Sequence, residues 1–176
     1  DNVPVEKVLE SYREANAEIS GLWQEAQLMI RELAKGKEKS IGVPQVLEPV
    51  GDLSAVRLPS GLLMRYDDLE GVNDSTGTEY TYKRRNGRAK IYGGKFVENA
   101  CQALARCIIA EQMLKISKKH RVALTVHDSI VCCVKEDDVE QAKQDIEMYM
   151  RWVPDWAEGL PLDCEAFVGR SYGECE

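Results

Sequence analysis

A long stretch with helical periodicity restricts the fold of this chain more than any other feature of the sequence. Between residues 95 and 119, apolar side chains recur at helical spacing over about seven turns. The residues expected on the buried side are Val97, Ala100, Cys101, Leu104, Ala105, Ile108, Ile109 and Met113. We therefore expect this segment to form the central helix of the domain.

A polar tripeptide separates two apolar segments that follow this helix. In residues 122–126 larger apolar side chains alternate with Ala and Thr, and residues 130–134 form a continuous apolar run that favours β structure. Between them lies His127-Asp128-Ser129. Because Asp and Ser favour turns, the pattern predicts an antiparallel hairpin with Asp128 exposed at its tip.

The first 36 residues carry two apolar series with helical spacing. One begins after Pro4, a residue type that is tolerated in the first helical turn, and the other continues to Gly36. A bend is expected near Asn16, between the two series. These patterns predict helices that contribute to a core and not a cofactor-binding segment.

Glycine and proline interrupt the region over residues 37–92, as is typical of hairpins and loops. One tight hairpin is predicted around Pro59-Ser60-Gly61. A second is predicted around Asn86-Gly87, a pair typical of a type I′ turn, with residues 78–84 and 88–92 as its strands.

The remaining patterns predict one more helix and one more strand. Asp137 or Asp138 is suited to cap a helix that ends before Pro154, and residues 162–166 alternate as expected of a strand. This order of elements predicts an α+β fold, with helices packed on a small antiparallel sheet. The expected segments are helices over residues 1–36, hairpins and loops over 37–92, and the long helix with the polar-tipped hairpin over 93–176.

Charge alone argues against a protein that binds nucleic acid. The chain has 30 acidic and 23 basic residues and a net charge of −7, which is the wrong sign for binding by phosphate neutralisation alone. The basic residues nevertheless cluster in two segments, 83–90 and 115–121. Each cluster is either a solvated face or a binding surface, and the sequence leaves both interpretations open.

Neither a membrane span nor a secretory signal is evident in the sequence. We therefore expect no membrane association and a cytoplasmic location. The six cysteines form no C-x-x-C pair and lie among apolar residues, which favours free, buried thiols over disulfides or a zinc site.

The polar hairpin tip is the strongest candidate for a chemical site. A short carboxylate on a rigid tip suits a divalent metal, which must be positioned accurately, so Asp128 is a candidate metal ligand. The competing interpretation is that Asp128 only closes the turn. A Ser-His-Asp triad is disfavoured because the three residues are contiguous and neighbouring strand residues point to opposite faces. A hydrolase that uses His127 is the weakest alternative.

One longer pattern joins the central helix to the hairpin. The helix begins with the sequence YGGKFVENACQALAR over residues 92–106, and Val126-His127-Asp128 follows about one helix later. This combination resembles family A DNA polymerases, most closely their phage-type branch. Similar residues extend upstream to Tyr12-Arg13 and downstream to Tyr172-Gly173, so the resemblance covers nearly the whole chain.

The resemblance implies a role for each candidate residue. His127-Asp128 corresponds to the family's motif C, whose aspartate binds catalytic Mg²⁺ at the primer terminus, so Asp128 is implied as metal ligand and catalytic residue. Gln102 and His127 are implied as contacts to primer–template DNA, with Gln102 in the minor groove. Arg106 lies four residues after Gln102 and either shares this role or belongs to a solvated face. Ser129 stands where relatives often have glutamate, which removes an auxiliary carboxylate.

Other parts of the family's active site are missing from the sequence. Nothing resembles motif A, which supplies the second metal-binding aspartate, or the fingers helix that binds the incoming nucleotide, and both would precede residue 1. The resemblance implies that residues 1–36 follow the fingers and that residues 93–176 belong to the palm. It also implies a two-metal Mg²⁺ site to which this chain gives one carboxylate.

Two interpretations of function follow. The first is an excised piece or split subunit of a DNA-directed DNA polymerase, inactive alone, from a bacterial or phage-infected cell. Its implied partners are primer–template DNA, deoxynucleoside triphosphates and a polypeptide that carries the missing motifs. We then expect Gln102, His127 and Asp128 to lie on one concave surface. The alternative is a non-catalytic DNA-binding or assembly module, such as a prophage polymerase remnant.

Overall fold

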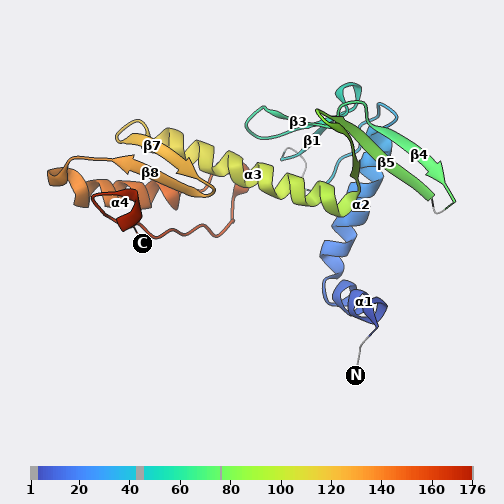
Figure 1. Cartoon of the computed structure of the whole chain (residues 1–176), viewed down its shortest axis with the longest axis horizontal. Helices are drawn as coiled ribbons and strands as arrows, with labels where there is room; N and C mark the ends of the chain where they lie inside the picture. The colour runs from blue at the N-terminus through green and yellow to red at the C-terminus, as the bar shows by residue number, and fades with distance from the viewer. Residues whose placement is uncertain (1–3, 43–45, 76, 176) are drawn as a thin grey trace. The chain divides into compact units, whose positions relative to one another are not determined.

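The computed structural model describes residues 4–42, 46–75 and 77–175. Within these ranges, four α-helices are combined with three small antiparallel sheets, so the α+β class expected from the sequence is confirmed (Figure 1). The chain divides into two compact units, one ending at Ala103 and the other beginning at Leu104. The first contains the two N-terminal helices and two of the sheets, and the second contains the hairpin with Asp128.

Two helices open the first unit and meet at a sharp break. α1 covers Val5–Ala15 and α2 covers Ala17–Leu33. Asn16 between them has φ −125° and ψ 51°, outside the helical region, and its side-chain amide donates to the Tyr12 carbonyl at 2.9 Å. The bend expected near Asn16 is thus confirmed. α1 buries no residue, whereas the inner face of α2 buries Ala26, Met29, Ile30 and Leu33.

Two antiparallel sheets follow α2. The first contains, in this order, β1 (Glu48–Val50), β2 (Ala55–Arg57) and β3 (Leu63–Arg65). The second contains β4 (Glu70–Asp74), β5 (Gly77–Arg84) and β6 (Gly87–Ile91). Both hairpins predicted in this region are confirmed, because β2 pairs with β3 and β5 pairs with β6.

The turn of the β5–β6 hairpin differs from the prediction. Arg84 pairs with Gly87, which leaves Arg85 and Asn86 as the two-residue loop. A type I′ turn needs positive φ at both loop residues, and neither has it. Gly87, with φ +116°, takes the first position of the returning strand. The type I′ prediction is wrong because Gly87 is the first residue after the two-residue loop and not one of the loop residues.

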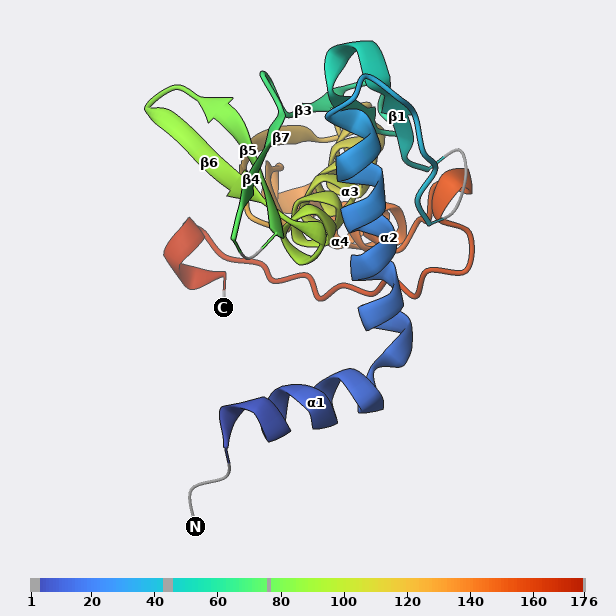
Figure 2. The ribbon, with the colours of Figure 1, turned by 90° about the vertical axis from the view of Figure 1, so that its right-hand side faces the viewer.

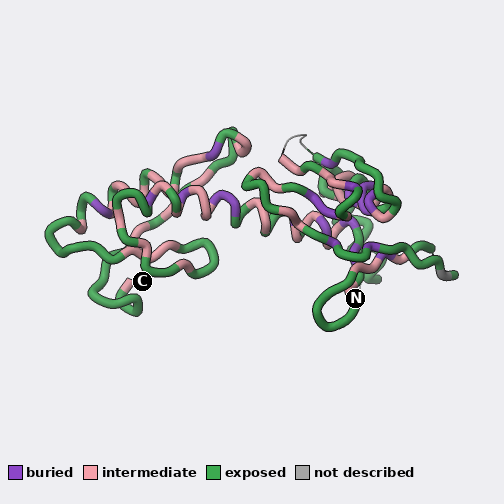
Figure 3. The backbone as a smooth tube through the Cα atoms, turned by 90° about the horizontal axis from the view of Figure 1, so that it is seen from above, coloured by how far each residue is buried: buried purple, intermediate pink, exposed green. Residues whose placement is uncertain are grey.

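The core of the first unit contains aromatic rings from the sheets and from α3 (Gly93–Ile116). Tyr66 lies edge-on to Tyr82, with 5.1 Å between ring centroids, and its centroid is 6.0 Å from that of Phe96. Asn99 donates to the Tyr66 hydroxyl at 3.3 Å. Burial raises the pKa of Tyr66 to about 12. Tyr66 and Phe96 belong to one buried cluster with the inner face of α2. Figure 3 colours the backbone by burial, with the buried residues in purple.

α3 begins in backbone contact with α2. Gly93 donates its N–H to the Gln27 side-chain oxygen at 2.8 Å. A Cβ on Gly93 would stand 1.9 Å from the Trp23 carbonyl oxygen, so only glycine fits at this approach. The next residue, Gly94, has room for a methyl group, whose closest neighbour would be 3.5 Å away. The close contact therefore fixes where the helix that carries Gln102 begins.

Polar side chains organise the second unit. Its elements are the rest of α3, β7 (Arg121–Val126), β8 (Ser129–Cys133) and α4 (Val139–Met150). Gln112 of α3 is 1% exposed and donates to the carbonyls of Met150 at 2.7 Å and Trp152 at 3.1 Å. It thereby pairs the last carbonyl of α4, which the helix itself leaves unpaired, and the Trp152 carbonyl just beyond the helix. Asp138 takes the N-cap position of α4, but its side chain makes no capping hydrogen bond.

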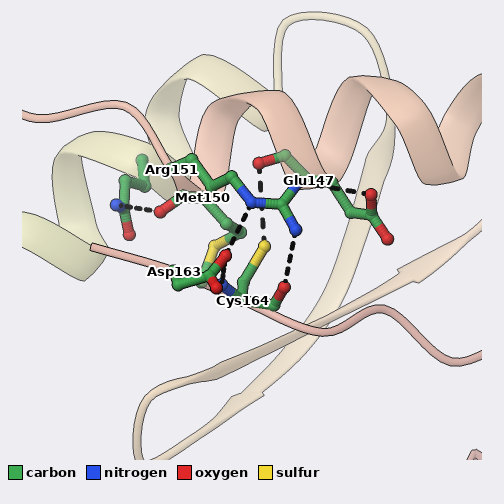
Figure 4. Close-up of polar contacts among 6 residues, drawn as sticks. Glu147, Met150, Arg151, Asp163 and Cys164 are labelled. Atoms are coloured by element: carbon green, nitrogen blue, oxygen red, sulfur yellow. Dashed lines mark hydrogen bonds and ion pairs between the residues drawn. The ribbon is translucent and has the colours of Figure 1, made fainter. Parts of the chain in front are cut away.

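The segment after α4 is extended but is not a strand. Half-buried and exposed residues alternate over residues 162–166 as expected. This segment nevertheless pairs with no strand in the described part of the chain, so the predicted final strand is wrong. Arg151 holds it instead, donating to Asp163 Oδ1 at 2.7 Å and to the Cys164 carbonyl at 2.9 Å (Figure 4). Glu147 lies 3.3 Å from the same guanidinium.

The six cysteines form no disulfide in the structure. Their expected burial is only partly correct, because Cys107 is buried whereas Cys101 and Cys133 are exposed. Burial raises the pKa of the half-buried Cys132 thiol, which keeps this thiol protonated. None of the helices in the described ranges has both the length and the apolar character required to cross a membrane.

Gly93→Ala is expected to destabilise the first unit, because the added methyl group would overlap the Trp23 carbonyl. We expect the free energy of unfolding to fall by about 1–3 kcal/mol, as for overpacking at other tight contacts. Chemical denaturation measures this change. Gly94→Ala is the matched control and should leave stability unchanged or slightly raised. Equal losses in the two variants would contradict the role of the close contact.

Candidate functional site

The polar-tipped hairpin predicted from the sequence is confirmed. β7 and β8 are antiparallel, with Thr125 opposite Ile130 and Val126 opposite Ser129. This register leaves His127 and Asp128 as a two-residue loop, and Asp128 is exposed. Paired strands therefore hold the carboxylate at a short tip with few degrees of freedom.

The backbone of this tip is strained at His127. His127 has φ +52°, in the left-handed region, whereas Asp128 does not have positive φ. A two-residue hairpin loop with positive φ at its first position favours glycine there. Turn formation thus does not require an imidazole at position 127, whereas aspartate at position 128 is an ordinary turn residue. Backbone strain of this kind clusters at functional sites, so the tip is a candidate site.

A half-buried hydrogen bond between His120 and Asp145 attaches the base of the hairpin to α4. His120, directly before β7, places Nε2 3.0 Å from Asp145 Oδ2, and both side chains are 13% exposed. Lys119 Nζ lies 3.4 Å from the same oxygen, and Gln141 donates to Asp145 Oδ1 at 3.2 Å. The hydrogen bond from His120, followed by those from Gln141 and Lys119, lowers the pKa of Asp145. The sequence did not reveal this pair, because its members are 25 residues apart.

Two of the proposed DNA-contact residues lie on α3. Gln102 and Arg106 are both exposed, and Arg106 forms no ion pair in the described part of the chain. Glu98, four residues before Gln102 on the same helix, accepts from Lys95 Nζ at 2.8 Å and 2.9 Å. Glu98 is therefore engaged locally. Gln102 belongs to the first unit and Asp128 to the second, so their common concave surface stays a prediction.

Asp128 offers one accessible carboxylate. Its side chain makes no hydrogen bond or ion pair with the described residues, and Ser129 beside it is exposed. Among these residues, no three His, Cys, Asp or Glu side chains gather into a metal-binding cluster. A hard cation such as Mg²⁺ prefers oxygen ligands and commonly combines one or two carboxylates with water and substrate phosphates. Asp128 fits one position in such a shared site, but not a complete metal site.

Comparison with known proteins points to one class, the phage DNA polymerases. The chain is 28% identical over 176 residues to the DNA polymerase of Bacillus phage SP02, in an alignment that covers 94% of this chain and 27% of that protein. It is 24% identical over 131 residues to the DNA polymerase of Bacillus phage SP01, in an alignment that covers 71% of this chain and 14% of that protein. The chain thus spans about a quarter of the first relative's length and less of the second's. No family model and no solved structure matches.

Substitutions at position 127 test the strain in the tip. Positive φ is unfavourable for a β-branched residue and costs glycine little. We therefore expect His127→Val to lower the free energy of unfolding by about 1–2 kcal/mol relative to His127→Gly. Thermal or chemical denaturation measures the difference. At Thr125, within β7, the order should reverse, with Val more stable than Gly, because strands favour β-branched residues. The same order at both positions would exclude strain at the tip.

The ion pair at the hairpin base predicts a specific acid sensitivity. The pKa of Asp145 in the folded state is below its ordinary value. The ionised carboxylate therefore stabilises the fold at pH values above the ordinary pKa, and this stabilisation is lost as the pH falls through the folded-state pKa. Between about pH 5 and pH 3, the wild-type protein should lose more stability than Asp145→Asn. Urea denaturation at a series of pH values measures this. Asp137→Asn, an exposed control, should follow the wild-type curve. Parallel curves for wild type and Asp145→Asn would refute the effect.

Proposed function

We propose that this chain is part of a phage-type, family A DNA-directed DNA polymerase, and that its β7–β8 hairpin is motif C of that enzyme. The observation that carries the proposal is the exposed Asp128 carboxylate at a strained two-residue tip. The similarity to two phage DNA polymerases supports it. On this proposal, α3, the hairpin and α4 belong to the palm of the complete enzyme.

Asp128 is then one ligand of a two-metal Mg²⁺ site. In nucleotidyl transfer, such ions activate the primer 3′ oxygen and neutralise the leaving pyrophosphate. Asp128 would orient the ions through its fixed place between paired strands. The second carboxylate of motif A and the cationic contacts to the nucleotide would come from the remaining polymerase polypeptide.

Three further residues receive proposed roles toward primer–template DNA. Gln102 would donate to minor-groove acceptors, which are nearly the same for all base pairs, so that it responds to pair geometry and not to sequence. His127, next to the metal ligand, would contact the primer terminus, and Arg106 would contact the backbone. Their exposure in the structure fits these roles. Ser129 carries no carboxylate, so Asp128 receives no acidic neighbour on its C-terminal side.

Primer extension tests the proposal. We expect no extension by this chain alone, because two-metal catalysis needs both aspartates. Adding a polypeptide with motif A and the fingers helix, such as the remainder of the SP02 enzyme, should restore extension. Asp128→Asn should then reduce the rate by at least about a thousandfold, because residues that act as a unit fail together.

Asp137→Asn is the matched control, since it removes an exposed carboxylate that lies outside the hairpin tip. It should extend primers as well as the parent chain does. Extension by the chain alone, or an Asp128→Asn mixture as active as the parent mixture, would refute the assignment of the metal ligand. If the parent mixture binds primer–template but never extends it, the alternative of a non-catalytic DNA-binding module is favoured.

A further inference from the structure

The β5–β6 hairpin reaches beyond the third strand of its sheet. β4 pairs with β5 only as far as Glu70 opposite Thr81, whereas β5 and β6 stay paired as far as Arg84 opposite Gly87 (Figure 2). Beyond Thr81 no third strand pairs with this ribbon in the described part of the chain, although the Lys83 N–H donates to the Asp67 carbonyl at 2.7 Å. Its loop residues, Arg85 and Asn86, are exposed.

Three cations at this end have no acidic partner. We call Lys83, Arg84 and Arg85 the cationic tip; all are exposed, and none forms an ion pair in the part of the chain that the structure describes. The two other basic residues of the hairpin are neutralised. Arg88 contacts Asp68 at 2.6 Å and Glu70 at 3.0 Å, and Lys90 pairs with Glu79.

The cationic tip is electrostatically unfavourable for the isolated chain. Three positive charges are consecutive, and none has an ion-pair partner among the described residues. Lys83 also lies opposite Arg88 in the register, but Arg88 is itself neutralised by Asp68 and Glu70. The turn itself needs none of these side chains, because its left-handed residue is Gly87. An external anion would relieve this repulsion.

The second basic cluster of the sequence behaves differently. Lys115 Nζ lies 3.8 Å from the centroid of the Trp152 ring, and Lys119 Nζ lies 3.4 Å from Asp145. These cations therefore contribute to packing and to an ion pair within the second unit. In this second cluster Lys118 and Arg121 are exposed and have no ion pair among the described residues, whereas the hairpin presents three such cations in succession.

We propose that the cationic tip binds the phosphate backbone of DNA. A chain with a net charge of −7 repels DNA overall, so contact requires a local concentration of positive charge. Long, exposed Lys and Arg side chains at a narrow tip provide this and contact phosphates without reading bases. The preference for an anionic partner follows from the hairpin alone, whereas the choice of DNA rests on the proposed function.

The test is the salt dependence of binding to a fluorescent primer–template duplex. The tip variant is Lys83→Gln with Arg84→Gln and Arg85→Gln. Each lost phosphate contact should make the negative slope of log K against log salt shallower by about 0.9. The slope of the tip variant should therefore be shallower than that of the parent by up to about 2.7. At about 100 mM salt its affinity should be at least about tenfold weaker than that of the parent chain. Arg84→Gln with Arg85→Gln should give an intermediate slope.

A charge-matched control removes three exposed cations elsewhere, with Lys7→Gln, Lys39→Gln and Lys135→Gln. It should bind within about twofold of the parent, because dispersed charges make no joint contact. An equal loss in this control, an unchanged tip variant or no binding by the parent at low salt would overturn the proposal. Poly-glutamate that competes as well as unlabelled DNA would also overturn it, because the tip would then fit an acidic protein surface.

Two separate measurements distinguish this proposal from the proposed function: the salt slope of DNA binding, and Asp128-dependent extension by the polymerase mixture. Asp137→Asn, outside both the cationic tip and the proposed metal site, should give the slope of the parent. A polymerase mixture that fails to extend primers while the slope still depends on the tip would refute the function and support the DNA contact. Conversely, normal extension that depends on Asp128, together with a salt slope that the tip variant leaves unchanged, would support the proposed function and refute the DNA contact of the cationic tip.

Discussion

The backbone contact between α2 and α3 is the constraint on which the first unit depends. At Gly93 the start of α3 lies so close to the Trp23 carbonyl that a side chain is excluded. Phe96 then lies fully buried, and its ring is close to that of Tyr66, whose hydroxyl accepts from Asn99 of the same helix. Because interiors are closely packed, a helix held one side chain farther from α2 would lose these contacts together.

Among the described residues, the second unit buries fewer residues than the first. Its buried residues are Cys107, Ile108, Gln112, Ile116, Ala142 and Pro154. Leaving a buried hydrogen-bonding group unpaired costs about 1–3 kcal/mol, so the donation from Gln112 keeps the Met150 carbonyl from incurring this cost. Gln112 Oε1 itself is buried without a partner among the described residues, which offsets part of this gain. Exposed ion pairs such as that between Arg151 and Asp163 contribute only about 0–1 kcal/mol each.

Periodicity predicted most of the helices and hairpins, because burial on one face leaves a pattern in a single segment. The type I′ turn and the last strand were mispredicted because local composition does not show where Gly87 falls in the register or whether an extended segment has a partner. In the candidate site, the exposed position of Asp128 was predictable from polar residues between apolar strands. The strain at His127 can be recognised only from its backbone φ, and the His120–Asp145 pair only from the folded structure, so neither was visible in the sequence.

The buried phenol in the first unit gives this protein an internal optical reporter. The pKa of Tyr66 is about 12 in the folded chain, whereas an unfolded tyrosine ionises near its ordinary value of 10. Between these values, unfolding releases one proton from Tyr66 and adds the ultraviolet absorption of one tyrosinate. At such pH, loss of this core is visible by absorbance alone, without a label. Since the folded state holds the extra proton, alkali also weakens the first unit through the same residue.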